Sequence, residues 1–136
     1  MSEVYPDEKG VVARVRERFP EEANRTDGWL RERGWDDLLD DSPHIWMEAF
    51  ADRTTEAVRA RDWNLVKEHT GFIAAECRNG TEVIRRLVDV SYAENLMWDL
   101  EESEKAVAWP NIAKELRDMY ERAWGRWEWM NQCDTL

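Results

Sequence analysis

The chain has 136 residues, of which 43% are hydrophobic, and its 30 acidic residues outnumber its 19 lysines and arginines to give a net charge of −11. This length and composition predict one folded domain, residues 1–136, and exclude a disordered chain. The charge argues against direct nucleic-acid binding, which needs a basic patch, and favours a basic protein partner. Solubility and adaptation to high salt are the alternative reasons for such a charge.

Residues 1–10 are polar and acidic and lack the basic and apolar regions of a signal peptide. No stretch approaches the length of a membrane span, so we expect a cytoplasmic protein that does not associate with membranes. The two cysteines, Cys77 and Cys133, form no CxxC pair, and no histidines lie at zinc-ligand spacing. We expect no metal and no cofactor, with Cys77 in the core, and leave open whether the two cysteines pair.

The first half of the chain predicts helices of unequal regularity. Apolar residues recur at helical spacing over residues 9–19, and Pro20 ends this segment. Residues 21–41 are less regular, and Gly28 and Gly34 are expected to divide them into short helical pieces. Serine followed by proline at Ser42-Pro43 then predicts a helix over residues 43–60.

The next signals are caps. Asp62 predicts the start of a helix that runs to residue 78, and Asn79-Gly80 predicts a left-handed stop. Thr81 caps a third central helix, expected to continue to about residue 100 with Glu82 and Arg86 as a supporting pair. Its inward stripe is expected to contain Val83, Ile84, Leu87, Val88, Val90, Met97 and Trp98.

An acidic connection follows, and Pro110 is expected to open the last clear helix, which Gly125 ends or bends. No strand-period run rivals these helices, and their short connections imply antiparallel neighbours. The predicted fold class is therefore all-α, a compact multi-helix bundle of antiparallel helical hairpins. A short α-solenoid-like stack is the alternative.

The chain contains nine tryptophans, an unusually high number for its length. Most are expected to fill the core, since each buries a large apolar area. Some could instead be exposed anchors for a partner. Trp127 and Trp129, with Trp124 before them, are the best candidates, because their spacing cannot place all three rings on one helical face.

Two acidic clusters are the other candidate partner-binding feature. Asp36, Asp37, Asp40 and Asp41 surround two leucines, and Glu101, Glu102 and Glu104 form a second acidic rim. The first cluster lacks the ligand spacing of an EF-hand loop. Both clusters are interpreted either as solvated faces or as electrostatic docks for a basic partner.

Three polar residues interrupt apolar stripes: Arg53, His69 and Glu94. A buried charge must be paired or reach water. We expect Arg53 and Glu94 to form a structural ion pair completed by Tyr92 or Asn95, with solvent exposure of both side chains as the alternative. His69 is interpreted as a satisfied core histidine.

An enzyme is the less favoured class. Glu94 and His69 would form a minimal acid–base pair. The sequence has no nucleophile in a known setting, no glycine-rich phosphate loop and no metal-ligand spacing. We therefore predict that the protein is not an enzyme.

Several segments between Phe50 and Trp124 resemble a bacterial helical domain family of unknown function. They are residues 57–63, Phe72-Ile73, residues 78–83, residues 90–96, Trp109-Pro110 and residues 116–120. Members of that family look like small proteins encoded beside polymorphic or contact-dependent toxins. The resemblance implies an immunity protein but carries no site residues, and residues 1–40 show no match.

These observations favour a protein-binding inhibitor, an immunity protein that neutralises a basic toxin domain by direct binding. Small size, negative charge and the absence of a recognisable active site all fit that reading. A generic adaptor or regulatory interaction domain is the alternative, and a small helical enzyme using His69 and Glu94 ranks third.

Overall fold

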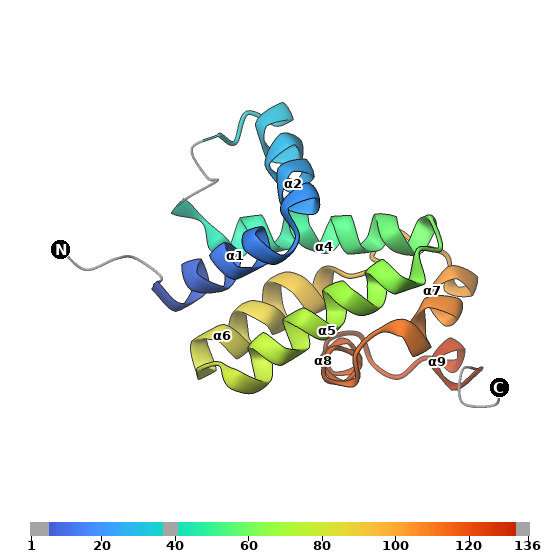
Figure 1. Cartoon of the computed structure of the whole chain (residues 1–136). Helices are drawn as coiled ribbons and strands as arrows, with labels where there is room; N and C mark the ends of the chain where they lie inside the picture. Colours follow the sequence, from blue (N-terminus) through green and yellow to red (C-terminus); the bar gives the residue numbers. More distant parts are fainter. Residues whose placement is uncertain (1–5, 37–40, 133–136) are drawn as a thin grey trace.

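The structure is a computed structural model that describes residues 6–36 and 41–132. These residues form a compact all-α fold without a strand, as the sequence predicted (Figure 1). The α-helices are α1 (Pro6–Arg18), α2 (Pro20–Glu32), α4 (Pro43–Arg59), α5 (Trp63–Asn79), α6 (Glu82–Leu87), α7 (Glu102–Ala108), α8 (Lys114–Trp124) and α9 (Glu128–Gln132).

Most predicted helix starts are confirmed. Pro43 occupies the first position of α4, as predicted, where proline's missing N–H costs nothing; Pro20, predicted only to end the first helix, also begins α2. Asp62 caps α5 by accepting a hydrogen bond from Leu65 N at 3.2 Å, and Thr81 caps α6 through Ile84 N at 3.4 Å. The start expected at Pro110 is wrong, because that residue lies in a 3-10 turn, Trp109–Asn111, before α8.

Two glycine predictions are wrong. Gly28 does not interrupt α2, which runs through it to Glu32. Gly80 ends α5 in an extended conformation, with φ −97° and ψ 176°, and not in the left-handed region. Glycine is required there by crowding, since a Cβ atom would lie 2.5 Å from the Glu76 carbonyl oxygen.

The third central helix is shorter than predicted. After α6 the backbone widens into a π-helical turn, Val88–Tyr92, and then tightens into a 3-10 turn, Ala93–Asn95. Leu96 is extended, and Met97 is left-handed with φ 58°. The π-turn shifts the helical register, so Val90 and Trp98 point outward instead of inward, and Val83 is also exposed. The supporting pair is Glu82 with Arg85, not with Arg86.

Helix α4 lies at the centre of the fold. It contacts α1, α2, α5 and the π-turn, and α4 and α5 form an antiparallel hairpin, whereas α2 crosses α4 steeply (Figure 1). Trp46 and Phe50 of α4 are fully buried and stack at 5.6 Å with an interplanar angle of 9°. Eleven of the 17 residues of α4 are buried, so the core surrounds this helix on most of its sides.

A charged contact joins α1, α2 and α4. Arg16 of α1 donates two hydrogen bonds, of 2.7 and 2.8 Å, to Asp27 of α2, and Trp46 Nε1 donates to the same carboxylate at 2.9 Å. Burial opposes ionisation of Asp27, but hydrogen bonds from Arg16 and Trp46 outweigh it and lower the pKa of the carboxyl group. The contact orients α2 across α4.

Candidate functional site

The two polar residues proposed as an acid–base pair do not meet. His69 is completely buried, and its Nδ1 lies 2.9 Å from Thr54 Oγ1, which lies 2.7 Å from the Tyr92 hydroxyl. Glu94 is half-exposed beyond the π-turn, and no hydrogen bond joins it to His69. Burial lowers the pKa of His69 to about 4, which keeps the imidazole neutral near pH 7.

The predicted ion pair between Arg53 and Glu94 is wrong. Arg53 is buried and pairs with Glu56 one turn along α4, at 3.3 Å. The π-turn moves Glu94 out of the expected stripe. Tyr92 and Asn95 do not complete such a pair either, since Tyr92 bonds Thr54 and the Asn95 amide donates to the Ser91 carbonyl oxygen at 2.9 Å.

A second histidine lies in an arrangement that the sequence did not suggest. Ser91 Oγ lies 2.7 Å from His44 Nδ1, and His44 Nε2 lies 4.0 Å from Glu8 Oε2. Hydroxyl, imidazole and carboxylate in series are the parts of a nucleophilic site. Ser91 is only 1% exposed, however, and 4.0 Å is too long for a hydrogen bond. We interpret these contacts as links between α1, α4 and the π-turn.

The tryptophans divide into core and surface groups. Trp46, Trp109 and Trp129 are buried, and Trp29 and Trp63 are partly buried against the core. The exposed side chains are Trp35 (41%), Trp98 (64%), Trp124 (49%) and Trp127 (49%). Most tryptophans therefore pack against the core, and several remain available as anchors.

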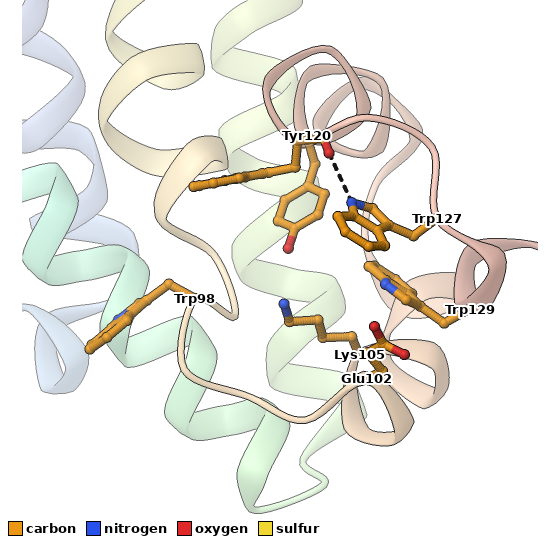
Figure 2. Close-up of a pocket in the computed structure, with 7 residues that line it drawn as sticks. Trp98, Glu102, Lys105, Tyr120, Trp127 and Trp129 are labelled. Carbon is orange, nitrogen blue, oxygen red and sulfur yellow. Dashed lines mark hydrogen bonds between the residues drawn. The ribbon is translucent and has the colours of Figure 1, made fainter.

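Three of the exposed tryptophans gather around one pocket of about 160 Å³. Trp98, Trp124 and Trp127 line it together with Tyr120, and Trp129 forms a buried wall by edge-to-face contact with Tyr120 at 6.1 Å. We call this feature the tryptophan pocket. Figure 2 shows Trp98 on one side and Trp127 and Trp129 on the other. Rings from four separate segments thus meet at one surface.

The exposed rings are held by their own indole N–H groups. Trp98 Nε1 donates to Asp52 Oδ1 of α4 at 3.1 Å. Trp124 Nε1 donates to the Glu94 carbonyl oxygen at 2.9 Å, and Trp127 Nε1 donates to the Trp124 carbonyl oxygen at 2.8 Å. Because these donors are satisfied within the protein, the apolar faces are left for an external group.

The strained backbone before Trp98 contributes to its placement. Met97 is buried with φ 58°, and its N–H donates to Thr55 Oγ1 at 3.0 Å. Non-glycine residues in this region cost of the order of 1 kcal/mol and persist where the surroundings hold them. Anchoring Met97 in the core directs Trp98 outward, beside Asp52.

Two charged side chains of α7 enter the tryptophan pocket. Glu102 and Lys105 are three residues apart and both line it, yet no ion pair joins them. Lys105 Nζ lies 6.0 Å from the centroid of the Trp129 ring. Figure 2 shows the Lys105 ammonium and the Tyr120 hydroxyl pointing toward one another. Burial raises the pKa of Tyr120, so its hydroxyl stays protonated.

A second pocket, of about 190 Å³, lies on the other side of Trp98. It is polar, and four of its charged side chains form ion pairs: Arg53 with Glu56, and Arg59 with Asp99. Burial raises the pKa of Asp52, which the hydrogen bond from Trp98 partly offsets. Trp98 therefore separates an aromatic pocket from a charged one.

The acidic residues predicted to bind a partner lie in two places. Asp36 and Asp41 are exposed, while Asp37 and Asp40 lie outside the described residues. Glu101 and Glu102 are exposed and Glu104 is half-exposed at the start of α7, which also supplies Glu102 to the tryptophan pocket. Only the second cluster adjoins this pocket.

The structure thus brings together Glu102, Trp127 and Trp129 of the predicted partner-binding residues, and adds Trp98, Tyr120 and Lys105. Sequence reasoning had assigned Trp98 to the core. The exposure of Trp98 could have been predicted from the acidic residues directly after it, because such a run is atypical of a buried helix.

Other site types have less support. Among residues 6–36 and 41–132, no group of three or more His, Cys, Asp or Glu side chains is arranged to hold a metal ion. Cys77 is a buried free thiol, and its pairing with Cys133 lies outside the described residues. Within the same described ranges, no helix combines the length and apolar character needed to cross a bilayer.

A protein-family model described as "Domain of unknown function (DUF7674)" matches residues 12–128. The chain belongs to this family. No curated protein and no solved structure shows significant similarity to it.

The DUF7674 match extends further than the resemblance between Phe50 and Trp124. It includes most of α1 and all of α2, so the expectation that the first forty residues have no match is wrong. Of the tryptophan pocket, only Trp129 falls beyond the matched residues. The pocket is therefore built almost wholly from the part of the chain that the family model describes.

Proposed function

We propose that this DUF7674 protein binds a protein partner through the tryptophan pocket and its acidic border. The observation that carries the proposal is the set of three exposed tryptophans, Trp98, Trp124 and Trp127, fixed around one pocket by internal hydrogen bonds. Tryptophan is enriched among the residues that dominate binding energy in protein interfaces. Rigid rings also lose little conformational entropy on binding.

The charge supports a basic partner. The chain has a net charge of −11, and Asp99, Glu101 and Glu102 follow Trp98 on the exposed surface. An acidic border around apolar anchors accelerates encounter with a basic surface and penalises acidic competitors. The partner is therefore proposed to be a basic protein domain.

The proposed role of this binding is immunity: the protein neutralises a cognate bacterial toxin in the cytoplasm. Toxin domains that act on nucleic acid need basic surfaces to contact phosphates. An acidic protein with an aromatic docking surface suits such a target, and small size fits an inhibitor. The resemblance of the central helices to proteins encoded beside toxins supports the same role.

The test is co-expression with the product of the neighbouring gene in a bacterial host. The neighbouring product alone is expected to stop growth, and this protein is expected to restore growth and to form a one-to-one complex. Replacing Trp98, Trp124 and Trp127 with alanine is expected to abolish rescue, since interface tryptophans often contribute 2 kcal/mol or more each.

Trp35→Ala is the matched control, because Trp35 is also exposed but does not line the tryptophan pocket. It should retain rescue, and circular dichroism should show that each variant folds. A neighbouring product that is harmless, or toxicity unaffected by this protein, would contradict the immunity role. A stable complex without toxicity would instead favour an adaptor.

A further inference from the structure

The tryptophan pocket contains polar groups that its own protein does not satisfy. Lys105 Nζ and the Tyr120 hydroxyl point toward one another without a hydrogen bond between them (Figure 2). Within the described residues, Lys105 has only its contact with the Trp129 ring, at 6.0 Å. It could pair with Glu102 one turn away on α7, yet no such ion pair forms. A cation, a carboxylate and a hydroxyl are therefore presented in a pocket whose other lining side chains are aromatic.

These groups limit the chemistry of a ligand. A cationic side chain would meet the Lys105 ammonium, which already faces the Trp129 ring. A carboxylate would meet Glu102 at the same pocket and a chain of net charge −11. A ligand of either charge would gain one attraction, to Glu102 or to Lys105, but it would meet one repulsion and would also lose its hydration on entering the pocket. A neutral ligand avoids both penalties.

A purely apolar ligand is also disfavoured. It would remove Lys105 and Tyr120 from water without supplying a partner, and an unsatisfied buried polar group costs about 1–3 kcal/mol. Sites that hydrogen-bond a substrate hydroxyl discriminate strongly against the analogue that lacks it. The ligand therefore needs an oxygen that accepts a hydrogen bond.

The aromatic walls determine the rest of the ligand. Trp98, Trp124 and Trp127 line a volume of about 160 Å³, which is enough for one aromatic ring. A phenol combines such a ring with an oxygen that accepts from Lys105 and a proton that Glu102 or Tyr120 accepts. We propose that the tryptophan pocket receives a tyrosine side chain of the partner, with Lys105 and Tyr120 as the groups that select its hydroxyl.

This inference rests on the proposed function for the identity of the partner, but a small probe tests the pocket by itself. N-acetyl-L-tyrosinamide and N-acetyl-L-phenylalaninamide would be titrated into the full chain labelled with ¹⁵N, with the tryptophan indole N–H signals as the readout. Assigned signals of Trp98, Trp127 and Trp129 should shift. The tyrosine probe should bind about fivefold more tightly, the ratio expected for one hydrogen bond.

Lys105→Met should reduce that preference to less than about twofold while retaining binding of the phenylalanine probe, because the aliphatic stem is kept. Lys67→Met is the matched control, since Lys67 is exposed on α5 and does not line the pocket. It should preserve the preference. Tyr120→Phe should weaken the tyrosine probe selectively.

Several results would overturn the inference. They are equal binding of the two probes, tighter binding of N-acetyl-L-argininamide or of the α-amide of N-acetyl-L-glutamic acid, and no shift of the pocket signals by any probe. Failure of the probes together with rescue that depends on Trp98 and Trp127 would leave the proposed function standing without this ligand. Selective tyrosine binding without toxin rescue would support the pocket chemistry and reject the immunity role.

Discussion

Residue 69 shows how burial converts an ionisable side chain into a structural one. His69 is fully buried between Phe19 and Phe50, with ring centroids 4.6 and 4.8 Å away, and burial lowers its pKa from 6.5 to about 4. The unfolded chain therefore binds a proton at a pH where the folded protein does not. Stability from the neutral imidazole is complete above pH 6.5 and is lost as pH falls from 6.5 to 4.

A pKa shift of this size lowers the free energy of unfolding by about 3 kcal/mol at pH 4 relative to pH 7. Urea denaturation at several pH values between 7 and 4 should show this decline, and His69→Gln should remove it whatever its effect at neutral pH. Glu48 and Asp52 act in the opposite direction, because burial raises their pKa values. An equal decline in His69→Gln would show that another group is responsible.

Single residues were predictable where one local pattern decides their environment. His69 was predicted to be a satisfied core histidine from its apolar neighbours; the structure buries it and gives Nδ1 a partner in Thr54, but Nε2 has no hydrogen-bond partner among the described residues. Arg53 was identified as a misplaced charge, but the wrong partner was assigned to it: Arg53 pairs with Glu56, three residues along the same helix, and not with Glu94. The position of Glu94 depends on the π-turn before it, and no spacing rule predicts this wide turn.

At the scale of elements, the junction between α5 and α6 makes a sharper prediction. Gly80 has ordinary extended angles, but a Cβ atom would lie 2.5 Å from the Glu76 carbonyl oxygen and 2.8 Å from Ile84 Cγ2. Gly80→Ala should therefore lower the free energy of unfolding by about 1–3 kcal/mol, the usual cost of overpacking. Gly80→Asn should cost at least as much, whereas a left-handed position would tolerate asparagine.

Gly71→Ala provides the control, because Gly71 lies inside α5, the helix that Gly80 ends. A Cβ atom at Gly71 would meet nothing within 4 Å. Alanine should stabilise the protein by about 0.5–1 kcal/mol, because glycine is a poor helix former. Chemical denaturation of both variants measures the difference, and tolerance of Gly80→Asn would refute the crowded, extended junction.

Helix starts were more predictable than helix ends. Pro43 and the capping side chains of Asp62 and Thr81 act locally, so the sequence contains their whole signal. The end of the third central helix depends on a distant group, since Thr55 of α4 accepts the N–H of Met97 at 3.0 Å. Tertiary contacts override the apolar pattern there, which is why Trp98 was assigned to the core but lies on the surface.

At the scale of the molecule, the candidate site is assembled from segments far apart in the chain. The segment after the π-turn supplies Trp98, α7 supplies Glu102 and Lys105, α8 supplies Tyr120, and the end of the chain supplies Trp127 and Trp129. The sequence predicted the last two and the acidic rim as separate features. They meet at one pocket because α7 packs against α9 and α8 packs against the 3-10 turn Ala93–Asn95. No single segment of the sequence contains the signal for this packing.

The acidic charge and the tryptophans are expected to control different steps of partner binding. With a net charge of −11, the association rate with a basic partner should fall by about tenfold or more between 50 and 500 mM NaCl, because salt screens long-range attraction. Glu101→Gln with Glu102→Gln should lower the association rate several-fold at low salt, and neutralising Asp36 and Asp41 should lower it less, since Glu102 lines the tryptophan pocket and Glu101 precedes it directly in the chain. Trp127→Ala should chiefly raise the dissociation rate, as loss of a short-range contact does. Surface plasmon resonance with the partner immobilised separates the two rates, and an association rate unaffected by salt would show that the charge serves solubility alone.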